Sequence, residues 1–278
     1  MATPSLTTHS LPGAIGPIGV EVRTARRDRS GPAVVIVPGF KSFPAWGFYP
    51  PTADRLARAG CAVLTVNLSG SGADARGEFT RLDRFARNTF GAEIQDLATV
   101  LEAIGRGDLD VAAPSCVGLL GHSRGGVAVL ANAARPEVRA LVTWSAIASV
   151  VRWDEGTRAE WRWRGHLDIP NVRTGQTMRV GLPLLDEVER DAAGALDLDR
   201  LAQDVPIPWL IVHGTADESV GFAEGRALAA ASGAPETRFV EVDGAGHTFG
   251  VAHPWAGSTP AFDRVLSESV AWFARHLA

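Results

Sequence analysis

The sequence predicts an α/β fold with a mostly parallel central sheet flanked by helices. Short apolar runs that are typical of buried strands alternate with longer segments whose apolar residues recur at helical spacing. Some of these runs end abruptly in turn-forming residues such as Pro38-Gly39. A chain of 278 residues that is 46% hydrophobic and 21% charged can bury one large core. We therefore expect one domain over residues 1–278, carrying a small insertion.

The expected elements follow in order along the chain. The first strand is expected to pair with a segment nearer the N-terminus, and the later ones to be buried in the parallel sheet. The predicted strands are 20–24, 33–37, 62–66, 117–120, 138–144, 209–212 and 237–242. The predicted helices are 52–59, 91–104, one that begins near 125, and 262–277.

The alternation of strands and helices breaks between residues 145 and 208. A structureless loop of that length is unusual in a compact domain, so we expect a small helical cap inserted at about residues 146–205. The segment contains Trp153, Trp161 and Trp163 together with many arginines.

Charge and cysteine content exclude several classes of protein. A net charge of −4 gives no reason to expect nucleic acid as a partner. The N-terminus lacks the pattern of a signal peptide, and no apolar run is long enough to cross a bilayer, so we expect a soluble, cytoplasmic protein without a membrane partner. Cys61 and Cys116 lie in apolar runs and lack metal-ligand spacing. No metal or organic cofactor is expected.

The segment Gly121-His122-Ser123-Arg124-Gly125 has the pattern G-x-S-x-G between a predicted strand and a predicted helix. This pattern places a serine on a tight, strained turn above the sheet edge, where side chains at the flanking glycines would collide with neighbouring backbone. The sequence therefore predicts Ser123 as a nucleophile.

A serine hydroxyl needs a base, and the base needs an orienting acid. Asp217 follows a buried strand, and His247 lies in a glycine-rich loop after the last strand, in the order that this architecture requires. Glu218 is an alternative acid and His253 an alternative base. His122 and His213 are expected to be structural.

These features resemble the α/β-hydrolase superfamily, in the group around the dienelactone hydrolases and their serine-bearing relatives. The resemblance covers about residues 20–278. It depends on the motifs Val37-Pro38-Gly39-Phe40, 121–126, 213–220 and 244–249. The name dienelactone hydrolase implies a cysteine nucleophile, and Ser123 in that place favours ordinary esters.

The resemblance also implies roles for further residues. The backbone amides of Phe40 and Arg124 are expected to form the oxyanion hole, and the side chain of Phe40 to line the substrate pocket. Trp144 matches a position where similar polyester-cleaving hydrolases carry an aromatic residue against the acyl group, and packing in the core is the equal alternative.

The cap itself offers further candidates. Trp153, Trp161 and Trp163 are expected either to form an apolar roof over the acyl group or to anchor the cap to the body. The cap arginines either grip a substrate carboxylate or form a solvated basic face; they are Arg158, Arg162, Arg164, Arg173 and Arg179.

The expected function is a serine esterase that acts on a small-molecule ester through an acyl-enzyme. One alternative is a serine peptidase or amidase of the prolyl-oligopeptidase type, which the absence of a preceding propeller domain disfavours. The other is a non-catalytic binding protein on the same fold, against which an intact set of three catalytic residues argues.

Overall fold

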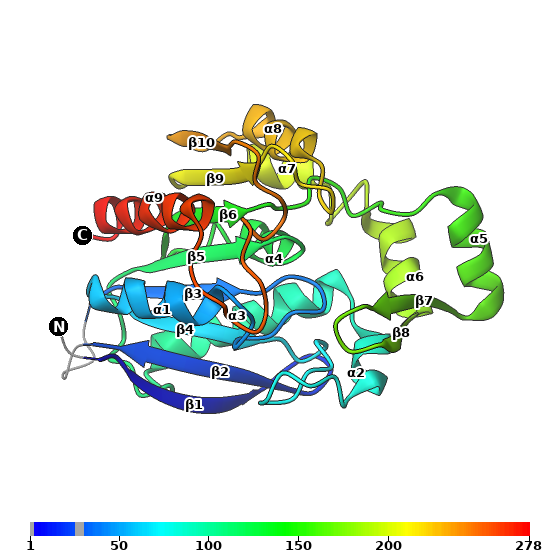
Figure 1. Cartoon of the computed structure of the whole chain (residues 1–278), viewed down its shortest axis with the longest axis horizontal. Helices are drawn as coiled ribbons and strands as arrows, with labels where there is room; N and C mark the ends of the chain where they lie inside the picture. The colour runs from blue at the N-terminus through cyan, green and yellow to red at the C-terminus, as the bar shows by residue number, and fades with distance from the viewer. Residues whose placement is uncertain (1–2, 26–30) are drawn as a thin grey trace.

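An eight-stranded sheet forms the centre of the molecule in the computed structural model, which describes residues 3–25 and 31–278 (Figure 1). The strand order is β1-β2-β4-β3-β5-β6-β9-β10, parallel from β4 to β10, with β1 and β2 antiparallel at one edge. The strands are β1 (Ser5–Pro12), β2 (Pro17–Thr24), β3 (Ala33–Val37), β4 (Ala62–Asn67), β5 (Val117–His122), β6 (Val138–Trp144), β9 (Trp209–Gly214) and β10 (Thr237–Val242). The predicted α/β class is confirmed, and the partner expected for the first strand is β1.

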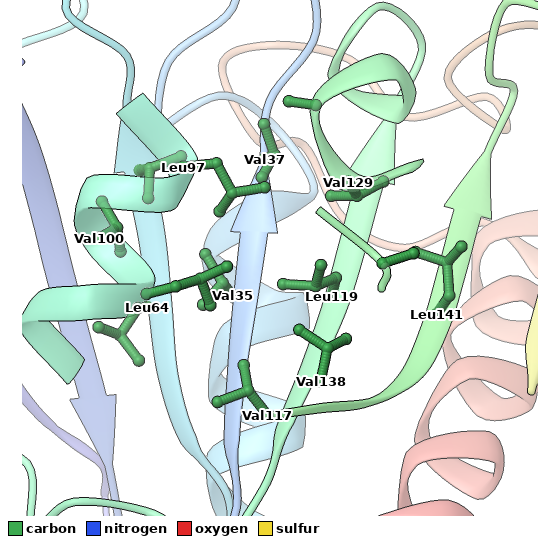
Figure 2. Close-up of a cluster of buried hydrophobic side chains, with 14 of the residues drawn as sticks. Val35, Val37, Leu64, Leu97, Val100, Val117, Leu119, Val129, Val138 and Leu141 are labelled. Atoms are coloured by element: carbon green, nitrogen blue, oxygen red, sulfur yellow. The ribbon is translucent and has the colours of Figure 1, made fainter. Parts of the chain in front are cut away.

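Helices cover both faces of the sheet. The helices α1 (Tyr49–Arg58) and α9 (Pro260–His276) pack on one face, and α3 (Phe90–Arg106), α4 (Gly125–Ala131), α7 (Leu198–Gln203) and α8 (Phe222–Ala231) on the other. Both faces of the sheet are apolar because a core lies against each of them. In β3, Val34 and Ile36 lie in the core under α1. Val35 and Val37 point instead to the core that includes Leu97 of α3 (Figure 2).

Local sequence signals set the ends of the two longest of these helices, α3 and α9, which have 17 residues each. Thr89 and Thr259 accept hydrogen bonds from the amides of Ala92 and Phe262 and so cap the helix N-termini. Gly107 ends α3 with a φ of 76°, a conformation that favours glycine. In the two described segments of the chain, no helix has both the length and the apolar character that spanning a membrane requires.

The inserted segment between β6 and β9 differs from the helical cap that the sequence predicts. It contains α5 (Glu155–Arg164), the antiparallel hairpin β7 (His166–Asn171) and β8 (Gln176–Gly181), and α6 (Leu182–Asp191). The hairpin and α6 pack beside α2 (Leu82–Arg87), a body helix that the sequence did not predict (Figure 1). The last helix of the predicted cap, α7, packs on α4 and α8 and therefore belongs to the body.

Candidate active site

Four loops meet at one edge of the sheet because the strands that carry them are parallel. The chain leaves β3 at Pro38, β5 at Ser123, β9 at Thr215 and β10 at Asp243, all at the carboxyl ends of the strands. In open α/β sheets this edge is where binding and catalytic residues gather.

Ser123 lies on a strained turn between β5 and α4. Its φ is 55°, in the left-handed region that a side chain disfavours. The flanking glycines allow the turn, because a Cβ on Gly125 would lie 2.4 Å from the carbonyl oxygen of Val37. A Cβ on Gly121 would lie 2.6 Å from a methyl group of Val129. The close approach of Gly125 also brings the loop after β3 against the serine turn.

Asp217 and His247 form a hydrogen-bonded pair, with 2.9 Å between Nδ1 of His247 and Oδ2 of Asp217. The other oxygen of Asp217 accepts the amides of Ser219 and Val220, each at 2.9 Å. Burial acts to raise the pKa of Asp217, but hydrogen bonds from His213, His247 and the Val220 amide outweigh it and lower this pKa well below the usual range. Asp217 is therefore a fixed carboxylate at neutral pH.

The arrangement leaves the second ring nitrogen of His247 free to act as a base. With Nδ1 donating to Asp217, Nε2 carries the lone pair. Ser123 and His247 line the same cleft. Their side chains form no hydrogen bond to each other here, and catalytic contacts of this kind often shorten only when substrate is bound.

The two alternative residues, Glu218 and His253, are placed differently from Asp217 and His247. Glu218 is exposed and forms no hydrogen bond or ion pair with His247, whereas Asp217 does. A ring nitrogen of His253 accepts the amide of Gly47 at 3.1 Å, and its ring stacks on Trp46. His253 therefore supports the wall of the cleft.

The amides of Phe40 and Arg124 are the backbone donors expected to form the oxyanion hole. Both residues line the cleft beside Ser123. Among the described residues, neither amide donates a hydrogen bond to another group, whereas the amides of Gly39 and Ser123 beside them are both paired. Two unpaired donors next to a nucleophile suit a developing oxyanion.

Two pockets open on either side of Ser123. The first, here called the Trp153 pocket, encloses about 400 Å³, and the second, the Arg173 pocket, about 500 Å³. Phe40, Lys41, Ser123 and His247 line both. The Trp153 pocket is completed by Phe90, Arg124, Ile147, Arg152, Trp153, Ser219 and Val220. The Arg173 pocket is completed by Gly39, Ser42, Trp46, His122, Asn171, Val172, Arg173, Thr248 and His253.

The structure corrects the prediction that Trp144 contacts substrate. Its side chain is fully buried in the core under α9, where it meets Phe48 and Phe249. Its indole nitrogen donates to Ser269 of that helix at 2.9 Å. Trp144 therefore packs below the sheet edge and stabilises the body.

Of the three tryptophans expected to roof the cleft, the structure places one, Trp153, in a pocket beside Ser123. Trp161 is fully buried under Trp153, with ring centroids 5.0 Å apart, and Trp163 is 85% exposed. Neither lines a pocket beside Ser123, whereas Trp153 does. The roof of the cleft is therefore Trp153, and Phe40 lines both pockets as expected.

Of the five arginines that the sequence analysis names, Arg173 is the one that lines either pocket. Arg162 pairs with Asp186 and Glu189, and Arg164 and Arg179 pair with Asp168. Arg158 lines neither pocket. Lys41 and Arg152 also line the cleft and were not predicted, because the pockets assemble from separate loops and no local pattern marks these two residues.

His122 joins the loops of the site from below. Its Nδ1 lies 3.3 Å from the hydroxyl of Tyr49, and its Nε2 lies 3.1 Å from the carbonyl oxygen of His247. The same hydroxyl accepts the amide of Gly39 at 3.2 Å. Tyr49 is the single tyrosine of the chain, and that could have marked it in the sequence. The expected structural role of His122 is thus a link between the loop after β3 and the loop that carries His247.

His122 should make stability depend on pH. Burial, and then the charge of His247, lower the pKa of His122 to about 3, so the unfolded chain binds a proton below about pH 6.5 that the folded chain refuses. The free energy of unfolding should therefore fall by about 2 kcal/mol through this residue between pH 6.5 and 4.5.

The measurement is denaturant unfolding at both pH values, for the parent and for His122→Gln. The lowered pKa of Asp217 makes stability depend on pH below 3.8, its value in the unfolded chain, and so outside this pH range. The variant should lose less stability on acidification than the parent. Equal losses would show that another group causes the effect.

Comparisons with known proteins fit this geometry. A model of the prolyl oligopeptidase family matches residues 46–278. The chain belongs to the prolyl oligopeptidase family. The match includes Ser123, Asp217 and His247, so this family member carries its candidate site inside the matched region. No curated protein matches the chain in sequence.

Solved structures show which fold this prolyl oligopeptidase family member shares. A putative hydrolase from Agrobacterium vitis S4 has a TM-score of 0.73 at 18% identity, over 96% of this chain and 99% of its own. Est1E from Butyrivibrio proteoclasticus with ferulic acid bound has a TM-score of 0.72 at 17% identity, over 94% and 95%. A puromycin-hydrolysing peptidase of Mycobacterium tuberculosis has a TM-score of 0.68 at 18% identity, over 99% of this chain and 40% of its own. The family member therefore has the α/β-hydrolase fold.

Proposed function

We propose that the protein is a serine esterase that cleaves small carboxylic esters through an acyl-enzyme. The proposal rests on one observation. Ser123 lies on a strained turn and lines the same cleft as His247. Nδ1 of His247 is hydrogen-bonded to the buried carboxylate of Asp217.

In the proposed mechanism, Nε2 of His247 takes the proton of Ser123 as the hydroxyl oxygen attacks the ester carbonyl. The amides of Phe40 and Arg124 hold the negative charge on the carbonyl oxygen. His247 then gives its proton to the departing alcohol, and a water molecule activated by the same residue cleaves the acyl-enzyme. Asp217 fixes the tautomer of His247 and stabilises its positive charge.

Peptide or amide hydrolysis is the second candidate, because the matched family is named for a peptidase. The lining of the cleft favours esters over peptides with a free amino terminus. In the described part of the chain, no aspartate or glutamate lines either pocket to receive an ammonium group. The aromatic side chains of Phe40, Phe90 and Trp153 suit an apolar acyl group instead.

The discriminating experiment compares ethyl cinnamate with N-ethyl cinnamamide, which differ only in the leaving atom, and adds alanyl and prolyl nitroanilides. We expect turnover of the ester and little of the amides. Faster turnover of a nitroanilide than of the ester would establish the peptidase. A fluorophosphonate should label Ser123, and a folded protein that resists labelling would be a binding protein on this fold.

Trp153 is expected to control which acyl group the enzyme accepts, because it roofs the pocket beside Ser123. Trp153→Ala should shift the ranking of esters of graded acyl length by roughly 1–3 kcal/mol in kcat/KM. The matched control is Trp163→Ala, whose exposed side chain lines neither pocket. An unchanged ranking in a folded Trp153 variant, or an equal shift in the control, would contradict this role.

A further inference from the structure

The charged side chains that line the cleft around Ser123 all have one sign. Within the part of the chain that the structure describes, both pockets lack carboxylate side chains. Four cations line them, namely Lys41, Arg124, Arg152 and Arg173. A cleft of this composition attracts anions and repels cations.

Two of these cations are compensated by carboxylates behind the pocket wall. Nε of Arg124 lies 2.9 and 3.0 Å from the two oxygens of the buried Glu93. Arg152 pairs with both oxygens of Glu224, at 2.7 and 2.6 Å. The positive charges of Arg124 and Arg152 are therefore largely neutralised within the protein.

Lys41 and Arg173 are not compensated in this way. Neither forms an ion pair within residues 3–25 and 31–278; Lys41 donates to the carbonyl oxygen of Pro170 at 3.1 Å. The guanidinium of Arg173 lies over the rings of Phe43 and Phe79, 5.1 and 5.6 Å from their centroids, which holds it at the rim of the cleft. Burial also lowers the pKa of Lys41, because it disfavours the charged form of the side chain. A bound anion would stabilise that charged form.

Both uncompensated cations line the Arg173 pocket, and Lys41 lines the Trp153 pocket as well. The Arg173 pocket extends along the loop that carries His247. Thr248 and His253, which follow His247 in its loop, line this pocket and not the Trp153 pocket. A leaving alcohol must lie against the base that protonates it. His247 lines both pockets, but its loop continues along the Arg173 pocket, so the alcohol portion of an ester is placed there and the acyl portion in the Trp153 pocket.

We propose that Lys41 and Arg173 form a subsite for an anionic oxygen group, a carboxylate or a phosphate, on the alcohol portion of the substrate. This inference rests on the esterase function proposed above and specifies its substrate class. The hairpin between β7 and β8 supplies Arg173, and its Pro170 carbonyl binds Lys41. The cap and the loop after β3 therefore build the subsite together.

The test uses butyrate esters of phenols that differ in one meta substituent. The substituents are methyl, carboxymethyl, phosphonomethyl and trimethylammoniomethyl, in which a methylene group insulates the ring from the charge. We expect kcat/KM of the full-length protein for the carboxymethyl or phosphonomethyl ester to exceed that for the methyl ester by about five- to tenfold at low salt. The ester that gains more identifies the anion, and sodium chloride should reduce the gain.

Substitutions then assign the gain to the two cations. Arg173→Met and Lys41→Met should each lower the ratio of the anionic to the neutral ester, and Arg173→Lys should restore part of it. The matched control is Arg179→Met on the same hairpin, which makes the same change in net charge away from both pockets. Its ratio should equal that of the parent. Circular dichroism checks that each variant is folded.

Several results would overturn the subsite. These are an equal rate for neutral and anionic esters, a preference for the cationic ester, or a preference that survives both substitutions. A gain seen only when the anion is on the acyl portion, as in a monophenyl glutarate, would also contradict the placement. If no ester is cleaved and Ser123 is not labelled by a fluorophosphonate, the esterase function itself fails. Turnover of the methyl ester without a charge preference removes only the subsite.

Discussion

Ser123→Ala should lower kcat by about a million-fold and leave the fold intact. The reason is that Ser123 is the proposed nucleophile, on a strained turn that lines the cleft with His247 beside the unpaired amides of Phe40 and Arg124. Alanine and serine have the same φ preference, so the substitution should leave the backbone strain at this position unchanged. The melting temperature should therefore stay close to that of the parent. The measurement is ester turnover together with fluorophosphonate labelling and thermal unfolding.

Ser219→Ala is the matched control for this substitution, because Ser219 lines the Trp153 pocket and contacts Asp217 through its backbone amide, which alanine keeps. Its turnover should remain close to the parent value, and Ser123 should still be labelled. Covalent labelling that persists in the Ser123→Ala variant would place the nucleophile elsewhere.

His247→Ala should reduce kcat by a similar factor, about a million-fold, because the serine and its base act as one unit. The buried carboxylate of Asp217 would then lose its hydrogen bond to His247, although His213 at 3.5 Å and two backbone amides remain around it. Combining this substitution with Ser123→Ala should cost little more than either alone.

His253→Ala is the control for the base. The ring of His253 supports Gly47 and Trp46 at the wall of the cleft, so its loss should lower kcat/KM by less than about tenfold. The opposite ranking, with His253 essential and His247 dispensable, would move the base to His253.

Most of the sheet and the positions of the three candidate catalytic residues could be predicted from the sequence. Strand runs such as 33–37 are apolar on both faces, and a tight glycine turn follows β5, so the order of elements was visible in local patterns. The acid and base could be named because both directly follow strands that are parallel and share one edge. Helix α2 was not predicted because its six residues contain a single buried side chain, Phe85.

The roles of the tryptophans could not be read from local patterns. Side chains alternate along a strand, so Trp144 shares the face of Val142, but only the packing of α9 shows which face that is. Trp161 and Trp163 are two residues apart on α5 and therefore point in nearly opposite directions, one into the cap and one to solvent. The residue that reaches the cleft, Trp153, lies just before the N-cap Asp154, where no periodicity applies.

The strands that flank the insertion are direct neighbours in the sheet, with Trp144 paired to Val212. Because the two strands are parallel, the chain must cross the sheet from the end of β6 to the start of β9, and α7 packs against the body along this return. The residues from α5 to α6 can change in number without altering the hydrogen-bonded ladder between β6 and β9. A much shorter connection would change the entropy of closing this loop by only about 2 kcal/mol. A change in the cap can therefore reshape the pockets without moving Ser123, Asp217 or His247, because those three residues follow β5, β9 and β10 in the body.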